Sequence, residues 1–198
     1  LSLVVDNVAP SSLVVSAPSG TEGELLAMSA QAQDPGADTL IFTWDFGDGS
    51  ATVQGALVSH SYDDEGSYTV TVVVSDGDGG SETGTAAVVI TNVAPSISAL
   101  SGDLTGDEGA SLSWLVVASD PGFVDVLVYS WDFGDGSAPA SGASATHTFA
   151  DDGSYTVSVT VDDQDGGVVT DSVVVVVDNV APEVTSTPPA YGAQDVVY

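Results

Sequence analysis

The sequence of 198 residues contains no cysteine, no lysine and no arginine, whereas aspartate and glutamate together number 29, which gives a formal net charge of −29. Without cysteine, no disulfide bond can stabilise a domain, so each domain depends on its core or on bound ions. Without basic side chains, binding to nucleic acid or to an anionic membrane surface is strongly disfavoured, and lysine-based covalent chemistry is excluded. Because so much charge of one sign opposes compaction, we expect cations to collect on the chain.

Apolar runs long enough to cross a membrane are absent as well. Residues 173–177 are all valine, but this short run suits a buried strand and is far below the length of a membrane span. We therefore expect no membrane insertion in this segment. The sequence also lacks an N-glycosylation sequon at Asn7, Asn92 and Asn179, because each is followed by Val-Ala.

What the sequence does contain is an internal repeat. The segment Trp-Asp-Phe-Gly-Asp-Gly-Ser occurs at residues 44–50 and again, letter for letter, at residues 131–137. A histidine and a tyrosine downstream return with the same spacing of 87 positions. Upstream the spacing is 86, as between Glu22 and Glu108, so one residue is inserted in the loop before the second tryptophan. The chain therefore holds two whole units of the repeat.

The phrase Asn-Val-Ala-Pro marks the edges of these units, since it begins at Asn7, Asn92 and Asn179. It divides the chain into four predicted segments: residues 1–7, the closing strand of a preceding unit or a donor strand; residues 8–92, called unit one; residues 93–179, called unit two; and residues 180–198, the start of a further β domain or a linker.

Residues 1–5 carry the apolar face of a strand whose own sandwich is missing. An isolated apolar strand leaves backbone and side-chain groups unsatisfied, so we expect something to pair with it. Two partners are open: an upstream unit of a longer chain, or a neighbouring copy that accepts the strand and so builds a head-to-tail filament.

Apolar and polar residues alternate through both units with the period of two that is typical of strands. The clearest case is residues 68–74, where Tyr and Val alternate with Thr and Val. Trp44 and Phe46 share one face of another strand, and the glycines after them favour a tight turn. About seven short strands in each unit, without helical periodicity, predict an all-β fold of tandem β-sandwiches. We expect Trp44 and Trp131 to lie between the sheets.

The ordered motifs of each unit resemble the PKD (polycystic kidney disease) domain of secreted bacterial proteins. They are Glu-Gly, Asp-Pro, Trp-Asp-Phe-Gly-Asp-Gly-Ser, His-x-Tyr/Phe, Gly-x-Tyr-x-Val-x-Val and Asp-Gly-Gly, and they cover about residues 8–178. The resemblance implies immunoglobulin-like sandwiches joined end to end. It also implies a spacer or binding module of extracellular enzymes, adhesins or surface layers, calcium-bound in some members, and it does not imply catalysis.

Clustered acids suggest a calcium site, because Ca²⁺ takes oxygen ligands and loops of alternating Asp and Gly can wrap a cation. In a sandwich of this order the acidic loops and the Asn-Val-Ala-Pro hinge should share one end. The resemblance supports this, since the calcium-bound members use the leading Asn and the two loop acids. The alternative is that these acids only make turns and cap loops. The candidate ligands are Asn7, Asp34 and Asp76 in unit one and Asn92, Asp120 and Asp163 in unit two, with Glu22, Asp78, Glu108 and Asp165 nearby.

We identify no catalytic residue. Asp48 and Asp135 belong to the Gly-Asp-Gly turns, where an Asp side chain bonds its own backbone. His60 and His147 repeat before an aromatic residue and have no nucleophilic partner, which favours packing or hydrogen bonding. Glycoside hydrolysis would need a cleft holding one carboxyl of raised pKa, and duplicated sandwiches predict no asymmetric pocket.

Two functions remain open at this point. The first is a structural or spacer segment of an extracellular bacterial stalk, adhesin or filament, stiffened by calcium, whose partners are neighbouring units or copies joined end to end. The second is a carbohydrate- or protein-binding accessory module of a secreted hydrolase, which would use exposed aromatic residues. Most aromatics lie on inward strand positions, with Phe123 and Tyr191 as the main exceptions. The first function is therefore favoured, in an extracellular or cell-surface location.

Overall fold

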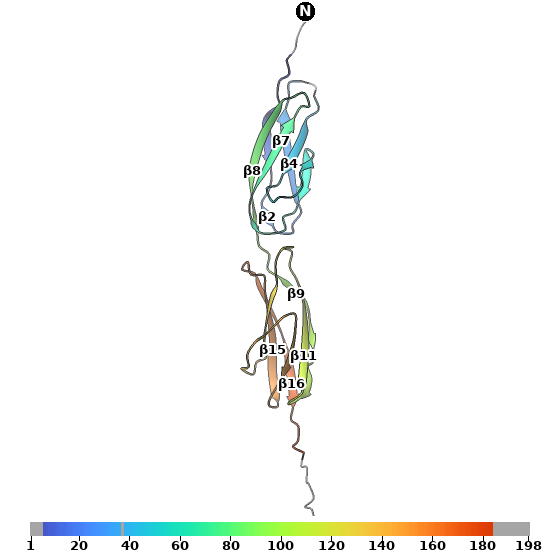
Figure 1. Cartoon of the computed structure of the whole chain (residues 1–198), viewed down its shortest axis with the longest axis vertical. Helices are drawn as coiled ribbons and strands as arrows, with labels where there is room; N and C mark the ends of the chain where they lie inside the picture. The colour runs from blue at the N-terminus through green and yellow to red at the C-terminus, as the bar shows by residue number, and fades with distance from the viewer. Residues whose placement is uncertain (1–5, 37, 184–198) are drawn as a thin grey trace, which may run out of the picture.

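The computed structural model of the chain describes residues 6–36 and 38–183, and all regular elements in this part are strands. No helix among these residues has the length and apolar character needed to cross a membrane. Two sandwiches follow each other along the long axis of the molecule (Figure 1). The predicted strand in residues 1–5 and residues 184–198 of the predicted further domain, including Tyr191, lie outside the described residues.

Unit one is a sandwich of two sheets. The smaller sheet has the order β1-β3-β6, and the larger has the order β2-β8-β7-β4-β5. All pairs are antiparallel except β2 with β8, which run parallel. The strands are β1 (Ser11–Ser16), β2 (Gly20–Thr21), β3 (Leu26–Gln33), β4 (Ile41–Asp45), β5 (Val53–Gln54), β6 (Leu57–His60), β7 (Gly66–Ser75) and β8 (Ser81–Thr91).

Unit two repeats this arrangement strand for strand. Its sheets have the orders β9-β11-β14 and β10-β16-β15-β12-β13, again with one parallel pair, β10 with β16. The strands are β9 (Ser96–Gly102), β10 (Thr105–Asp107), β11 (Ser111–Ser119), β12 (Val128–Asp132), β13 (Ala140–Ser141), β14 (Ser144–Thr148), β15 (Gly153–Asp162) and β16 (Val168–Asp178). The predicted all-β fold of tandem immunoglobulin-like sandwiches is confirmed.

Each unit has eight strands rather than about seven. The additional ones are two-residue strands such as β5, which pairs only with two residues of β4. Residues 51–59 look irregular in sequence because so short a strand leaves no alternating pattern. The pairing is visible only once β4 is in place beside it.

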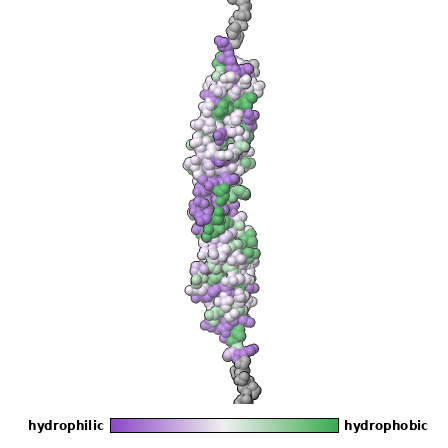
Figure 2. Space-filling model, viewed as in Figure 1, coloured by the Kyte–Doolittle hydropathy of each residue, from purple (hydrophilic) through white to green (hydrophobic). Residues whose placement is uncertain are grey.

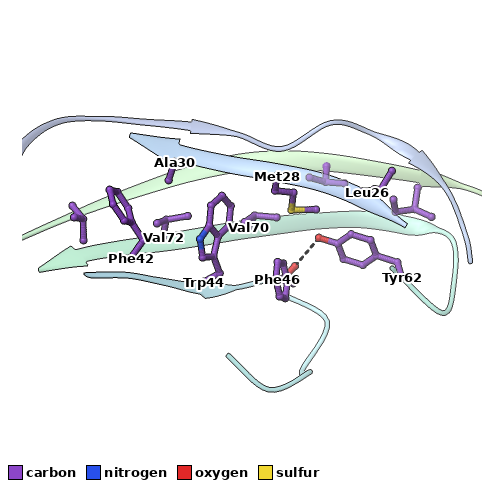
Figure 3. Packing of buried hydrophobic residues seen from close by; sticks show 12 residues of the cluster. Leu26, Met28, Ala30, Phe42, Trp44, Phe46, Tyr62, Val70 and Val72 are labelled. Atoms are coloured by element: carbon purple, nitrogen blue, oxygen red, sulfur yellow. Dashed lines mark hydrogen bonds between the residues drawn. The ribbon is translucent and has the colours of Figure 1, made fainter. Parts of the chain in front are cut away.

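The core of unit one lies between its two sheets, where the inward residues of β3, β4 and β7 meet (Figure 3). Trp44 is fully buried, and its Nε1 donates a hydrogen bond to the carbonyl oxygen of Gly55 at 2.8 Å. Trp131 is buried in the same way and donates to Gly142 at 2.8 Å. The predicted place of both tryptophans is thereby confirmed. The two cores share no residue, so each unit has its own source of stability.

The Gly-Asp-Gly turn after β4 is fixed by the side chain of Asp48. Its Oδ1 accepts the N–H of Ser50 at 3.0 Å, and its Oδ2 lies 2.6 Å from Nε2 of His60. The ring of His60 stacks on Phe46 with 3.8 Å between centroids. Unit two repeats these contacts, so the turn role of both aspartates and the packing role of both histidines are confirmed.

Truncating the buried tryptophan should unfold unit one selectively. We expect Trp44→Ala to lower the free energy of unfolding of unit one by about 3 to 5 kcal/mol, as other large core truncations do. Val73→Ala, at a half-exposed position of β7, is the matched control and should cost far less. Denaturant unfolding followed by circular dichroism measures both. Equal losses for the two variants would contradict the assigned core.

The Asp135 turn should lose its contribution to stability in acid. Burial alone would raise the pKa of this carboxyl, but hydrogen bonds from Ser137 and His147 outweigh burial and lower the pKa to about 2. A pKa below the unfolded value of roughly 3.9 stabilises the fold above that value, and the contribution disappears as pH falls toward 2. We expect the difference in Tm between the wild type and Asp135→Asn to shrink between about pH 5 and pH 2. Thermal melts across this range check it, and a growing difference would contradict it.

Candidate metal centre between the two units

The loop between β7 and β8 is closed by a buried carboxylate. Oδ1 of Asp76 accepts the N–H groups of Asp78 and Gly80, both at 2.9 Å. Oδ2 accepts a hydrogen bond from Nδ2 of Asn7 at 2.8 Å, so the leading asparagine is tied to this loop. The hydrogen bond from Asn7 is the largest influence on the Asp76 carboxyl and lowers its pKa.

Unit two closes its equivalent loop with the same bonds. Asp163 is 1% exposed, and its Oδ1 accepts the N–H groups of Asp165 and Gly167, both at 2.8 Å. Its Oδ2 accepts Nδ2 of Asn92 at 2.9 Å. Burial would raise the pKa of Asp163, but these hydrogen bonds outweigh burial and lower the pKa. The structure thus joins each predicted Asn and loop Asp directly, in the loop-capping role that was the alternative to metal ligation.

At the outer end of unit one, two of the predicted ligands line a pocket. Asn7 and Asp78 line it together with Asp38 and the Asp-Pro-Gly loop, and its volume is about 490 Å³. Asp34 turns inward on its own loop, where its Oδ1 accepts the N–H of Gly36 at 2.7 Å. Burial and then the negative charges of Asp78, Asp34 and Asp76 raise the pKa of Asp38. The acids of this end therefore lie close enough to repel one another.

Glu22 lies elsewhere, at the end of unit one that faces unit two. Its side chain is 1% exposed, and its Oε1 accepts the N–H of Val93 at 2.6 Å. Its own N–H donates to the carbonyl oxygen of Thr91 at 3.2 Å. Glu108 repeats this contact at the far end of unit two, where its Oε1 accepts the N–H of Val180 at 2.9 Å. Each glutamate thus anchors the segment that leaves its unit. Neither lies beside the candidate loop aspartates of its own unit, where the sequence predicted it.

The partners of Glu22 come from unit two. One carboxylate oxygen each from Glu22, Asp120 and Asp125 lies within 4.8 Å of the others. Glu22 Oε2, Asp120 Oδ2, Asp125 Oδ2 and the nearby Asn92 Oδ1 are all buried without a hydrogen-bond partner. Figure 2 shows the hydrophilic surface gathered at mid-length of the molecule, where the units meet. The three acids Glu22, Asp120 and Asp125 are called the junction cluster below.

Asp125 was missed by the sequence reasoning. A usable signal existed, because the Asp-Pro-Gly loop of each unit is followed by a second aspartate, Asp38 in unit one and Asp125 in unit two, with the repeat spacing of 87. Two further groups of acids approach one another in the described part of the chain: Glu22 with Asp64 and Glu65, and Glu108 with Asp151 and Asp152.

Electrostatics in the junction cluster are unfavourable when no cation is bound. Burial, followed by the negative charges of Glu22 and Asp120, raises the pKa of Asp125 to about 6. Burial is also the main reason that the pKa of Glu22 is raised. Oxygen ligands of one Ca²⁺ ion lie at most about 5 Å apart, since each Ca–O distance is roughly 2.3 to 2.6 Å. The donor set and its spacing therefore fit a hard divalent cation.

Comparison with known proteins identifies the family of both units. The family model of the PKD domain matches residues 7–91 and 92–177. The chain is 36% identical over 88 residues to "Microbial collagenase" of Vibrio alginolyticus, which covers 44% of this chain and 11% of that protein. It is 36% identical over 120 residues to "Chitinase A" of Pseudoalteromonas piscicida, covering 56% and 14%. It is 29% identical over 154 residues to "Collagenase ColA" of Clostridium perfringens, covering 77% and 13%.

These matches make up less than a sixth of the length of each relative. A solved structure of the amphioxus IgVJ-C2 molecule is similar over 79% of this chain and 98% of its own, with 18% identity and a TM-score of 0.45. The family resemblance stated from the motifs is confirmed. With both units matched in tandem, the chain belongs to the PKD domain family.

Proposed function

We propose that this chain is a non-catalytic spacer within a larger secreted hydrolase, in which two PKD domains hold neighbouring modules at a fixed separation. The observation that carries the proposal is the direct contact between the units at their junction. The chain leaves unit one at Thr91 and is bonded to Glu22 within two residues, through the N–H of Val93. The linker is short, and it is bonded to unit one through Val93 and to unit two through Asn92. These bonds restrict the rotation of the second unit relative to the first.

Two further contacts brace the junction. The loop that precedes β12 approaches unit one at Gly23, where a methyl group would lie only 2.9 Å from the carbonyl oxygen of Pro121. Val124, from the same loop, borders a pocket whose other walls include Asp48 and Tyr68 of unit one. Together with the hydrogen bond between Val93 and Glu22, these two contacts support a stiff connection between the units rather than a free hinge.

The relatives favour a hydrolase as the setting. Two are named collagenases and one a chitinase, and the matched region is a small part of each. This supports an accessory segment of a secreted enzyme over the stalk, adhesin or filament that the sequence favoured, and those three settings stay untested predictions. An extracellular location follows from the same relatives as part of the proposal.

A second candidate function rests on a specific surface. Phe123 is 84% exposed, and Val124 and Val126 beside it are 54% and 66% exposed. Large exposed apolar groups in one loop are typical of contact sites for other molecules. Figure 2 shows hydrophobic residues beside the hydrophilic junction on the visible face. In this second function, the loop would bind the insoluble substrate and so hold the enzyme against it.

A small substitution at the junction should test the spacer role. Gly23→Ala places a methyl group against Pro121, whereas Gly109→Ala, at the equivalent turn of unit two, meets nothing within 4 Å. Both glycines have positive φ, 68° and 76°, so both variants carry a similar local strain of roughly 1 to 2 kcal/mol. We expect only Gly23→Ala to disturb the alignment of the units. Amide ¹⁵N relaxation should show the wild type and Gly109→Ala tumbling as one elongated body. Independent tumbling of the two units in the wild type would contradict the proposal.

The contact role of the loop predicts a loss of binding to insoluble substrate. Phe123→Ala should reduce the fraction of the chain that sediments with collagen or chitin, because it removes the most exposed aromatic side chain of the described residues. Leu57→Ala is the matched control, since Leu57 is 80% exposed and lies on unit one. A wild-type chain that sediments with neither material would remove this second candidate and leave the spacer role intact.

A further inference from the structure

We propose that Gln164 of unit two is a positioning residue, whose side chain holds the loop of residues 120–126, called the junction loop, in the conformation that meets unit one. The inference deepens the spacer role and rests on it, because this loop supplies Pro121 and Val124 to the contacts that brace the junction. Gln164 itself lies in the turn between β15 and β16, within unit two.

The first support is the backbone conformation of Gln164. Its φ is 77°, in the left-handed region that residues other than glycine rarely adopt, because Cβ lies too close to the following carbonyl oxygen. The repeat places Gly77 of unit one at the equivalent position, where φ is 86°. Unit one thus makes this turn with the residue that adopts it most easily, whereas unit two makes it with glutamine at a conformational cost.

Packing does not explain the glutamine. A methyl group added to Gly77 would meet nothing within 4 Å, so a side chain that begins at this place of the turn enters open space. Gln164 is itself exposed. A buried contact therefore does not offset the cost of the strained backbone, and the reason for the glutamine lies in what its amide group binds.

The second support is the hydrogen bond made by that amide. Nε2 of Gln164 donates to the carbonyl oxygen of Val126 at 2.9 Å, across 38 positions of the sequence. The backbone N–H of Gln164 donates to Oδ1 of Asp162 at 2.7 Å, which fixes the turn from which the side chain starts. In unit one the N–H of Gly77 donates to the hydroxyl of Ser75 at 3.2 Å. Unit two thus has a charged acceptor in place of a hydroxyl where the turn is strained.

The third support is that the exposed part of the junction loop has few other contacts to order it. Phe123, Val124 and Val126 are 84%, 54% and 66% exposed, so apolar packing does not fix their backbone. Within the loop, the N–H of Asp125 donates to the carbonyl oxygen of Gly122 at 3.3 Å, which is longer than a typical bond of this kind. The bond from Gln164 therefore fixes how these residues are presented to unit one.

These observations assign the glutamine to positioning rather than to stability. The hydrogen bond of an exposed amide contributes no more to folding than the left-handed conformation costs. Replacing Gln164 by glycine should therefore change the stability of unit two little, although the junction loop loses its hold. A residue that served only the stability of unit two would show the opposite, a clear loss of stability with an unchanged loop.

The test is amide ¹⁵N relaxation of the whole chain carrying Gln164→Gly, Gln164→Ala or Gln164→Glu. Glycine removes both the strain and the amide group, alanine keeps the strain, and ionised glutamate keeps the length but has no N–H to donate. We expect the order parameters of Phe123 and Asp125 to fall from about 0.85 to below about 0.6 in all three variants. The amide resonance of Gly23, which lies against Pro121, should shift in all three as well.

Thermal melts of the same variants separate positioning from stability. Gln164→Gly should melt within about 4 °C of the wild type and roughly 2 to 8 °C above Gln164→Ala, because only glycine releases the strain. Gly77→Gln is the matched control in unit one. It should lower the melting temperature through the same strain and leave the amides of the junction loop as ordered as in the wild type.

Two results would overturn the proposal. One is a junction loop in Gln164→Gly whose order parameters equal those of the wild type. The other is a loop that loosens while the Gly23 resonance stays in place, since the loop would then not be held against unit one. Failure of the spacer role looks different, because the two units of the wild type would then tumble independently whatever the Gln164 variants show.

Discussion

The structure depends on how a chain with 29 acidic side chains and no lysine or arginine accommodates its carboxylates. Most buried acids are bonded to backbone N–H groups, which act as the positive partners that the sequence does not provide. Asp76 and Asp163 are each held by two backbone N–H groups and an asparagine amide. Such bonds stabilise the ionised form, so they fix loops without requiring a cation.

At the junction between the units, backbone N–H groups do not satisfy every buried carboxylate oxygen. Glu22 uses one oxygen for the N–H of Val93 and leaves the other without a donor, as do Asp120 and Asp125. The same place carries the only covalent link between the two sandwiches. Charge compensation and the alignment of the units therefore depend on the same group of residues at the junction. Val180 donates its N–H to Glu108, so unit two holds the segment that leaves it in the same way.

The sequence was sufficient for the architecture because the repeat and the strand periodicity are local signals. Residues 68–74 alternate, and β7 buries Val70, Val72 and Val74 as predicted. The same patterns predict that the tryptophans are buried, where the turns lie, and that each leading Asn lies beside its loop Asp. Strand β5 was less visible, because two residues carry no periodicity and their pairing depends on β4.

The neighbours of Glu22 could not be obtained in this way. A repeat spacing shows that Glu22 and Glu108 are equivalent, but it does not show which end of a sandwich they occupy or what faces them across a junction. Asp125 was overlooked because the one-residue insertion in its loop disturbs the match with Asp38. Contacts between domains depend on relative placement, which only the three-dimensional structure supplies.

The distribution of distances between the two units tests the central claim, a stiff junction, most directly. The chain has no cysteine, so Ser67→Cys and Ser154→Cys, at exposed positions of β7 and β15, would give one spin label on each unit. The account predicts a single, narrow distance distribution by pulsed electron resonance, because direct contacts hold the units in one arrangement. A broad distribution would contradict it.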